Sequence, residues 1–439
     1  MRIRFPHPFV LLLGGVLVAA VLTWILPAGR YERRTDPATG GEVVVAGTYK
    51  EVDASPVGLT QAVLAVPRGM VDGAEIIIVI LLVGGAYALL DRTGALGRLV
   101  AALVGRSRSP VAVIAGVSAI FATFGALENM HEEIIALVPV LLVLSRGLGF
   151  GAITALAMSV GAAVVGAAFG PTNPFAGGIA MRYAGLPLLA APALRVGMLL
   201  AATAVWFGWT VWQAKHDDIR PDLGPLPGEP VGYRDGVMLA LVVLPFAPYV
   251  YGVLRLDWGF NELSALFLVA GFAVGLMAGF GLRGTAVEFL KGMETMLAAG
   301  LFVGVARAIS VVLTDGQIID TIVHNLSQPL QRVPGYLAAA LMVPVHAALH
   351  IPVPSNSGHA VLTMPIMVPM ADLLAMPRLV AVIAYQTGAV LMDMLNPTNG
   401  ALLAMLLAAG VPYSRWLRFA IPGALLVSGV GFAGLALAF

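Results

Sequence analysis

The stretch that decides the fold covers residues 351–400 and reads IPVPSNSGHAVLTMPIMVPMADLLAMPRLVAVIAYQTGAVLMDMLNPTNG. It opens with a small polar cluster at 355–359, which is followed by an apolar run to Leu374. A longer apolar run begins at Arg378 and is interrupted at 396–399 by Asn-Pro-Thr-Asn. Proline and turn-forming residues inside an apolar run predict a broken helix. Because a break leaves backbone N–H and C=O groups unpaired, lipid tolerates it only where those groups line a cavity or hold a ligand.

A second stretch repeats this pattern earlier in the chain. A polar cluster at 128–133 precedes an apolar run to Leu144, and a longer apolar run is interrupted at 170–173 by Gly-Pro-Thr-Asn. Pro171 and Pro397 open the same Pro-Thr-Asn sequence, and they lie 226 residues apart (397 minus 171). A repeat of interrupted apolar helices in two halves is typical of a transporter binding site.

Composition sets the class of protein. The 439 residues are 59% hydrophobic and 11% charged, with a mean hydropathy of +0.91. These values predict an all-α polytopic membrane protein, in contact with a lipid bilayer. The net charge of +1 argues against a nucleic-acid partner, and the lack of cysteine excludes disulfides, cysteine-ligated zinc and thiol catalysis. The N-terminal apolar run, of roughly 20 residues, predicts a retained first span rather than a signal peptide.

The segment 110–125, before the first polar cluster, has two interpretations. It either crosses the membrane or forms one arm of a re-entrant hairpin whose tip is the polar cluster. If both polar clusters are hairpin tips, about nine spans remain, and matching helices of the two halves are then inverted. If the arms crossed, the halves would be parallel. Placing the N-terminus in the cytoplasm puts more than half of the basic residues in cytoplasmic loops, which favours the inverted arrangement.

The predicted layout has two inverted repeats, 1–212 and 259–439, joined by a linker with a connecting helix at 213–258. In the first repeat we expect two scaffold helices, an interfacial arm at 95–107, a hairpin at 110–147, a broken helix at 151–181 and a helix at 193–212. In the second repeat we expect helices at 262–280 and 293–313, an arm at 316–330, a hairpin at 335–375, a broken helix at 378–408 and a helix at 415–438. Glu75 and Glu294 hold matching positions at predicted helix starts, where a carboxylate stabilises the helix N-terminus.

The second tip, residues 355–358, carries small hydrogen-bonding groups: Ser355, Asn356, Ser357 and Gly358. Hydroxyl and carbonyl oxygens suit a hard cation, whereas N–H groups at the start of the next helix attract an anion. Ser355 also suits an ordinary helix N-cap. Because this tip belongs to a repeat and faces a second break, we favour a substrate or ion site.

The first break (170–173) contributes Thr172 and Asn173, and the second break (396–399) contributes Asn396, Thr398 and Asn399. Each break exposes carbonyls of one half-helix and N–H groups of the next. A simple proline kink, with Thr and Asn satisfying the freed backbone groups, is the alternative. The identical Pro-Thr-Asn in both halves favours a shared role in ligand binding, including a sodium site at the Asn173 and Asn399 breaks.

Asp393 lies one turn before the second break, inside a predicted span. An intramembrane carboxylate is expected to be functional, and this one can ligate a cation or carry a proton. We expect no cofactor beyond Na⁺ or H⁺ as the coupling ion.

The first tip, residues 128–133, differs in charge from the second tip. It carries Glu128, Asn129, His131, Glu132 and Glu133. Three carboxylates so close together repel one another, so we expect protonation, pairing with the imidazole or a bound cation. A solvated loop is the alternative. An acidic tip opposite one that suits a carboxylate favours a substrate with both an amine and a carboxylate.

Three histidines flank the second tip. His346 and His350 share a helix face, and His359 follows the tip. A metal site would need a further ligand, so helix packing or proton relay is favoured. Arg307, inside a predicted span, is expected to pair with a carboxylate or to line the cavity.

These residues together resemble the C4-dicarboxylate anaerobic carrier family, in its YfcC-like branch. The resemblance covers nearly the whole chain and is carried by an ordered set of matches: Glu132-Glu133, Asn173-Pro174-Phe175, Ser357-Gly358, Ala360, Leu362 to Pro365 and Pro397-Thr398. This chain departs from the family pattern at Asn356, where relatives usually carry glycine, and at His359, where they usually carry glutamine.

The resemblance places the chain in the ion-transporter superfamily. It implies an elevator-type fold with paired re-entrant hairpins, a homodimer, and sodium- or proton-coupled uptake or exchange of dicarboxylates or amino acids. We therefore expect a secondary active transporter of a small carboxylate-bearing metabolite in a bacterial inner membrane. An amino acid is the first choice because the first tip is acidic, and a C4-dicarboxylate is the alternative. An intramembrane enzyme is disfavoured because no hydrolase or protease motif is present. A channel is disfavoured because the two tips are unlike.

Overall fold

The computed structural model describes residues 8–35, 42–45, 47–95, 98, 102, 109–132, 134–217, 231–245, 248–249, 251–252, 256 and 258–439. Up to residue 214 the helices are α1 (Pro8–Ile25), α2 (Leu59–Asp72), α3 (Ala74–Arg92), α5 (Pro110–Glu128), α6 (Ile134–Gly147), α7 (Ala152–Leu156), a π-helix (Ala157–Gly161), α8 (Ala162–Phe169), a π-helix (Pro174–Gly178), α9 (Ile179–Tyr183) and α10 (Pro192–Ala214). The later helices are α11 (Tyr233–Val243), α13 (Phe260–Met277), α14 (Gly281–Asp315), α15 (Ile319–Ser327), a 3₁₀ helix (Gln328–Arg332), α16 (Gly335–His350), α17 (Asn356–Leu373), α18 (Arg378–Tyr385), a π-helix (Gln386–Val390), α19 (Gly400–Ala408) and α20 (Tyr413–Ala438).

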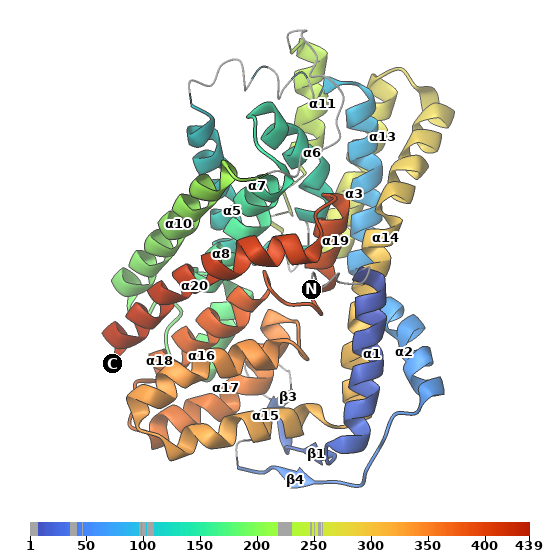
Figure 1. Ribbon diagram of the computed structural model, residues 1–439. Coiled ribbons are helices and arrows are strands. Elements are labelled where there is room, and N and C mark those ends of the chain that lie inside the picture. Colours follow the sequence, from blue (N-terminus) through green and yellow to red (C-terminus); the bar gives the residue numbers. More distant parts are fainter. Residues whose placement is uncertain are drawn as a thin grey trace.

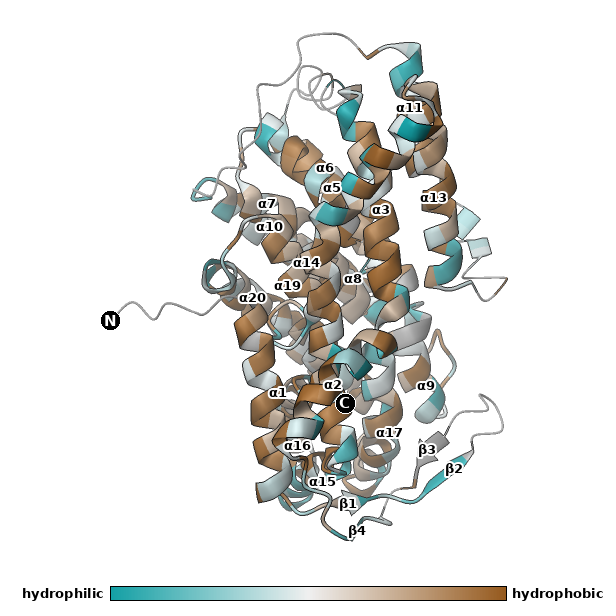
Figure 2. Cartoon of the chain, turned by 90° about the vertical axis from the view of Figure 1, so that its right-hand side faces the viewer, coloured by the Kyte–Doolittle hydropathy of each residue, from teal (hydrophilic) through white to brown (hydrophobic). Residues whose placement is uncertain are grey.

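Seven of the described helices are long and apolar enough to cross a membrane, judged by length and composition. They lie at 74–92, 110–127, 152–169, 192–214, 260–277, 281–315 and 413–438. One of them, α5, is the segment whose course the sequence left open. Figure 2 shows the apolar residues distributed along the helices, with polar residues on strand β2 (Arg33–Thr35) and near α11. The chain is therefore a mostly helical, multi-pass protein, as its composition predicts.

The longest helix, α14, extends past both α3 and α1 (Figure 1). Its 35 residues run alongside α2 and α3, which follow one another with only Gly73 between them. Glycines allow these backbones to approach, because a Cβ on Gly69 would meet the Gly304 carbonyl at 2.5 Å and a Cβ on Gly292 would meet the Gly84 carbonyl at 2.7 Å. Small residues at such crossings let helices pack closely in a membrane.

This arrangement corrects one expected helix and one expected cap. The helix expected at 293–313 begins twelve residues earlier, at Gly281. Glu294 therefore lies inside α14 and stabilises no helix start, whereas Glu75 does lie in the first turn of α3. The early part of α14 carries Glu288, which pairs with Lys291 at 2.9 Å. Charged residues of this kind made the segment before residue 293 look like a loop in the sequence, so the predicted helix was too short.

The polar segment after α1 forms two short antiparallel pairs, β1 (Gly29–Arg30) with β4 (Lys50–Glu51) and β2 (Arg33–Thr35) with β3 (Glu42–Val44). It is fixed to α15, because the Arg33 guanidinium lies 2.9 Å from the buried Asp320 carboxylate. The expected arm at 316–330 is helical, since α15 and the 3₁₀ helix cover most of it. The other expected arm, at 95–107, lies largely outside the described residues, as does much of the linker at 213–258, although Arg98 pairs with Asp235 of α11 at 2.7 Å.

The two broken helices are present where the repeat predicts them. In the first, α7, a π-helix and α8 end at Phe169, and the chain resumes helical structure at Pro174. In the second, α18, a π-helix and two further helical residues end at Met392, and α19 begins at Gly400. The second break thus starts at Asp393, which the sequence placed within the helix. Both broken helices contain a π-helix, a rare structure that often occurs at functional sites.

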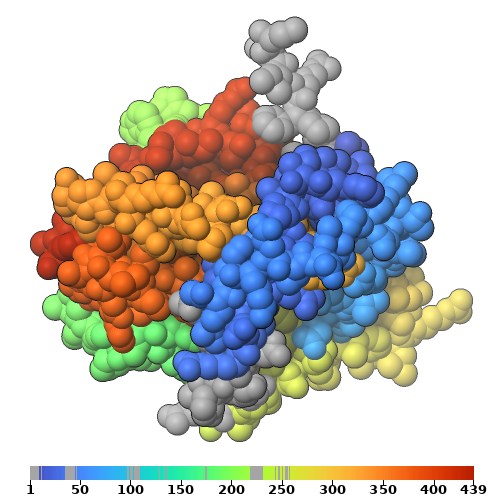
Figure 3. Space-filling model, turned by 90° about the horizontal axis from the view of Figure 1, so that it is seen from below, coloured from blue at the N-terminus to red at the C-terminus, as the bar shows by residue number. Residues whose placement is uncertain are grey.

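Each broken helix packs tightly against the helix that precedes its tip. A Cβ on Gly125 of α5 would collide with the Ala163 carbonyl of α8. A Cβ on Gly388 would likewise collide with the Val343 carbonyl of α16. Seen from below, the orange segments of the second half lie beside the blue N-terminal segments (Figure 3). Contacts of α14 with α19 join the long helices to the second broken helix, and contacts of α3 with α6 join them to the helix that follows the first tip.

Candidate functional site

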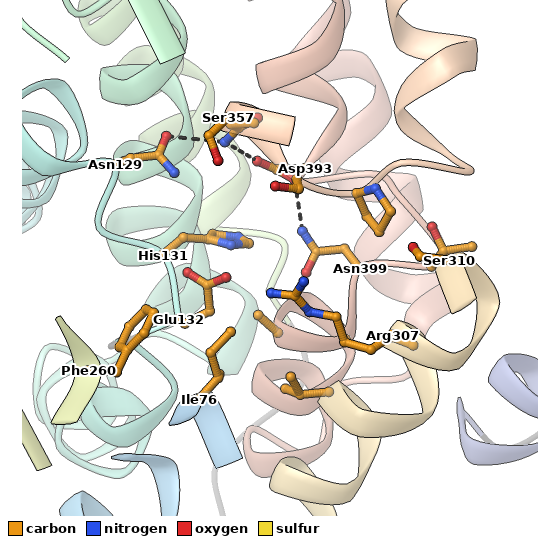
Figure 4. Close-up of a pocket in the computed structure, with 18 of the residues that line it drawn as sticks. Ile76, Asn129, His131, Glu132, Phe260, Arg307, Ser310, Ser357, Asp393 and Asn399 are labelled. Carbon is orange, nitrogen blue, oxygen red and sulfur yellow. Dashed lines mark hydrogen bonds between the residues drawn. The ribbon is translucent and has the colours of Figure 1, made fainter. Parts of the chain in front are cut away.

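A cavity of about 370 Å³ lies where both tips, the second break and the long helices meet (Figure 4). The predicted site residues that line it are Asn129, His131, Glu132, Ser355, Asn356, Ser357, Asp393, Thr398 and Asn399. The structure thus brings together residues that lie more than 200 positions apart in the chain. Thr172, Asn173, Gly358, His359 and Asn396 do not line it. The side chains of Glu128 and Glu133 lie outside what the structure describes.

Asn129 joins the first tip to the second. It ends α5 in the left-handed conformation (φ 58°), which asparagine adopts more readily than most residues. Its side-chain oxygen accepts hydrogen bonds from Asn173 Nδ2 at 3.4 Å and from Asn356 Nδ2 at 3.1 Å. One amide therefore links the first tip, the first break and the second tip.

The second tip is a capped helix start. Ser355 Oγ accepts the Gly358 N–H at 3.3 Å, so the N-cap interpretation of Ser355 is confirmed. This cap leaves the N–H groups of Asn356 and Ser357 at the first positions of α17, where a helix has no internal acceptors. Because both residues line the cavity, an anionic group there can reach the positive end of a helix dipole.

Asp393 is the most densely hydrogen-bonded side chain of the cavity. Only 5% of the residue is exposed. Its carboxylate accepts from Asn356 Nδ2 at 2.8 Å, from Asn399 Nδ2 at 2.9 Å and from His350 Nε2 at 2.9 Å. Donors of this number allow a carboxylate to stay ionised in a buried site. Asp393 and Glu132 therefore both line the cavity, each with a carboxylate (Figure 4).

The asparagines of both breaks act as helix caps. Asn173 Oδ1 accepts the Ala176 N–H at 2.9 Å, and Asn399 Oδ1 accepts the Leu402 N–H at 3.0 Å. A sodium ion bound to either side-chain oxygen would share it with, or displace, that cap. Asn399 still faces the cavity, whereas Asn173 turns its amide to the Gly125 carbonyl at 3.0 Å and fastens the first tip to the first break.

The other break residues serve the same fastening role. Thr172 donates to the Ala126 carbonyl at 3.3 Å, behind the first tip. Asn396 donates to the His350 carbonyl at 2.8 Å, and Thr398 donates to the Ile351 carbonyl. These bonds satisfy carbonyls that the ends of α5 and α16 leave free. Each break therefore holds its own tip in place.

The far wall of the cavity comes from the long helices. Arg307 and Ser310 of α14 line it, with Phe260 of α13 and Ile76 of α3. Arg307 lies 3.4 Å from Asp72, so it both lines the cavity and pairs with a carboxylate. Ser310 follows Arg307 by three positions, which places both on one helix face. That spacing is the signal that would have identified Ser310 from the sequence.

Sequence reasoning missed the groups that hold the carbonyls of each broken helix. Arg195 is 3% exposed and donates to the Leu188 carbonyl at 2.6 Å, and its guanidinium reaches the Gly170 carbonyl at 3.5 Å. In the second half, Tyr413 donates to Leu395 at 2.6 Å and Trp416 donates to Met394 at 2.7 Å. Arg195 could have been identified from the sequence, because it is a charged residue in the first turn of an apolar helix.

The three histidines lie together behind the cavity rather than in it. His346, His350 and His359 are fully buried, and among the described residues the side chain of His350 is the one of these three that hydrogen-bonds to a cavity residue, Asp393. Among the described residues, no group of three or more His, Asp or Glu side chains is arranged to hold a metal ion. The interpretation of these histidines as packing or proton-relay groups stays a prediction.

Two solved transporter structures are similar to this chain over nearly its whole length. They are YdaH of Alcanivorax borkumensis (17% identical, TM-score 0.44, covering 98% of each chain) and MtrF of Neisseria gonorrhoeae (15% identical, TM-score 0.42, covering 99% of this chain and 95% of that one). TM-scores below 0.5 do not establish a shared fold, so the family rests on the sequence comparisons.

Two curated proteins and one family model match the sequence. An uncharacterized protein of Haemophilus influenzae is 27% identical (97% of this chain, 96% of its own length). A putative basic amino acid antiporter of Escherichia coli, YfcC, is 25% identical (95% of this chain, 93% of its own length). The model of the C4-dicarboxylate anaerobic carriers matches residues 5–439. These matches indicate a membrane transporter, and not an enzyme, that acts on a small molecule across a lipid bilayer. The resemblance read from the sequence is thereby confirmed: this chain belongs to the C4-dicarboxylate anaerobic carrier family.

Proposed function

We propose that this protein is a secondary active transporter that exchanges a cationic amino acid such as arginine or ornithine. The observation that carries the proposal is the charge layout of the cavity. Asp393 and Glu132 supply two carboxylates, and the start of α17 supplies free backbone N–H groups. A substrate with both a cationic group and a carboxylate complements that layout, because each of its charges meets the opposite one.

The substrate has one orientation that uses these groups. Its carboxylate would lie at the N–H groups of Asn356 and Ser357, and its cationic group would lie near Asp393 and Glu132. The cavity volume of about 370 Å³ falls within the ~300–1,000 Å³ common for small-molecule sites. The similarity to YfcC, a putative basic amino acid antiporter, supports the same substrate class.

A C4-dicarboxylate is the second candidate, and the family description favours it. Such a substrate needs a second cationic partner besides the start of α17. Arg307 lines the cavity but already lies 3.4 Å from Asp72. Two carboxylates in the same cavity would repel a doubly charged anion, so we rank this candidate below a cationic amino acid.

We propose further that the transporter works as an elevator. The two halves, 1–212 and 259–439, act as inverted repeats, and helices α5–α6 and α16–α17 act as re-entrant hairpins. The hairpins and broken helices move together against the long helices, with Na⁺ or H⁺ as the coupling ion. A homodimer in a bacterial inner membrane, with the N-terminus in the cytoplasm, completes the proposal. The tight packing of each broken helix on its hairpin supports movement as one body.

A thermal-shift screen of the purified protein followed by transport in liposomes tests the substrate class. We expect arginine, lysine or ornithine to raise the melting temperature, because a ligand that binds the folded state stabilises it. Radiolabelled arginine should then exchange with internal arginine in liposomes. Stabilisation by succinate or fumarate without any effect of basic amino acids would contradict the proposal. Running each ligand with sodium and with potassium separates a sodium requirement from simple binding.

A further inference from the structure

We infer that a chain of three buried histidines carries a proton to and from Asp393, so that the transporter exchanges protons for its cationic substrate. The inference rests on the proposed transport function and adds its coupling ion. It concerns groups behind the cavity that substrate binding does not use.

The histidines form a continuous hydrogen-bonded path. His346 Nδ1 lies 2.9 Å from His359 Nε2, and His359 Nδ1 lies 3.4 Å from His350 Nδ1. His350 Nε2 then lies 2.9 Å from Asp393 Oδ1, at the wall of the cavity. All three imidazoles are fully buried. Side chains from α16 and α17 thus connect a site deep in the protein to the carboxylate of the second break.

The direction of every hydrogen bond follows from the carboxylate end. An ionised Asp393 only accepts, so His350 donates from Nε2, and a neutral His350 must accept at Nδ1. His359 therefore donates from Nδ1 and accepts at Nε2, where His346 donates from Nδ1. His346 Nε2 is left as an acceptor, and it has no hydrogen-bond partner among the described residues. All hydrogen bonds of the path therefore donate toward Asp393, and the acceptor without a partner, His346 Nε2, lies at the opposite end.

A proton can pass along this path without breaking it. A proton bound at His346 Nε2 lets His346 release its Nδ1 proton to His359 Nε2. His359 then releases its Nδ1 proton to His350 Nδ1, and His350 releases its Nε2 proton to Asp393. One proton enters, one arrives, and each histidine ends neutral with its tautomer reversed. Every hydrogen bond persists with donor and acceptor exchanged, since each imidazole carries one donor and one acceptor.

Other titratable or charged groups face the path from the elements packed around it. The Tyr385 ring of α18 lies 5.6 Å from the rings of His346 and His359. His131 of the first tip lines the same cavity as Asp393. Glu132 of the first tip and Arg307 of α14 line the same cavity. The Tyr385 hydroxyl already donates to the Asn356 carbonyl at 2.7 Å. The three histidines are therefore the groups whose ring nitrogens pair as donor and acceptor along the path.

Protonation of Asp393 changes what the cavity can hold. The ionised carboxylate offers a counter-charge to a cationic amino acid, and the protonated one does not. A proton and the substrate cation therefore compete for Asp393, and occupancy by one disfavours the other. Alternating occupancy on the two sides of the membrane gives exchange of one proton for one cationic charge.

The inference is tested in liposomes that contain the protein and a pH-sensitive dye and are given radiolabelled arginine. The quantity measured is the number of protons moved per arginine moved. The diagnostic variant is His346→Asn, whose Nδ2 can still donate to His359 but which has no second nitrogen to accept a proton. His216→Gln, at an exposed histidine outside the path, is the matched control. We expect the variant to keep arginine–arginine exchange within about twofold. The number of protons moved per arginine should fall by roughly 100-fold, the low end of the contribution of a positioned proton-transfer group.

Each outcome has a distinct meaning. A His346→Asn ratio equal to that of the wild type would overturn the histidine path. Wild-type arginine transport driven by sodium with no proton movement would overturn it too, while leaving the proposed function intact. Wild-type protein that moves no arginine would instead refute the proposed function. If His346→Asn fails to fold, as judged by gel filtration, His359→Gln interrupts the middle of the path and must show the same loss of ratio.

Discussion

The two breaks occupy matching places, but different groups hold the helix carbonyls beside them. In each half, the fourth residue of the following long helix reaches back to the broken helix: Arg195 of α10 at the first break and Trp416 of α20 at the second. The first break thus has a cation beside its carbonyls. The second has a neutral indole, and its charge is the carboxylate of Asp393. The two breaks therefore hold matching places in the chain but differ in the charge of the side chains beside them.

The difference assigns unequal roles to the halves. At the first break, Asn173 faces away from the cavity and fastens the first tip. At the second break, Asn399 faces the cavity and holds Asp393. The polar side chains that line the cavity therefore come mainly from the second half, with Asn129, His131 and Glu132 from the first tip. Four tests, which use six substitutions, probe this asymmetry.

Asp393→Asn should have the largest effect. It removes the buried charge that we assign to the substrate cation, and breaking such a pair costs about 2–5 kcal/mol, or roughly 30-fold to more than 1,000-fold in affinity. Arginine exchange in liposomes should fall to background while the variant still elutes as a folded protein. Asp372→Asn, at an exposed carboxylate paired with Arg378, is the control and should transport normally. Normal exchange by Asp393→Asn would remove Asp393 from the site.

Glu132→Gln should have the next largest effect. It keeps the shape of the first tip and removes the second carboxylate of the cavity, which is more open to water than Asp393. We expect arginine transport to fall about tenfold or more, because screened charges contribute less than buried ones. Competition by unlabelled amino acids would show whether selectivity for cationic over neutral substrates falls as well. Unchanged selectivity would exclude the acidic first tip as the cation site.

Asn399→Ala and Asn173→Ala compare the two breaks directly. Both remove an N-cap, and loss of such a cap costs about 0.5–2 kcal/mol, so both variants should melt at a lower temperature. The effects on transport should differ, with a loss of about tenfold in Asn399→Ala and about twofold in Asn173→Ala. The reason is that Asn399, unlike Asn173, donates a hydrogen bond to Asp393. Equal losses of transport would mean that both breaks are ligand sites.

Trp416→Phe should have the smallest effect. It removes the indole N–H that Met394 accepts, and one net hydrogen bond is worth about 1 kcal/mol. We expect a lower melting temperature with transport retained. Arg195→Gln, the equivalent change at the first break, should destabilise more because Arg195 donates to two carbonyls, that of Gly170 at the break and that of Leu188 in the loop before α10. The reverse order would show that the cation beside the first break is not structural.

The sequence by itself determined the membrane class, the two broken helices and the family. The breaks follow from local chemistry, because Pro171 and Pro397 each stand in a cluster of turn-forming residues, Gly-Pro-Thr-Asn and Asn-Pro-Thr-Asn. A lone proline is not enough, since Pro139 and Pro365 lie inside α6 and α17. The N-cap at Ser355 is equally local. The length of α14 could not be predicted from hydropathy, since Glu288 and Lys291 read as a loop until their partners are known.

Only the tertiary structure decided which polar residues meet. Asn129 and Asn356 are 227 positions apart, and His350 and Asp393 are 43 apart, so no spacing rule could pair them. The structure also divided residues that look equivalent in the repeat, turning Asn399 toward the cavity and Asn173 away from it. The physical reason is that a repeat fixes backbone breaks, whereas the packing of two unlike halves fixes where each side chain points.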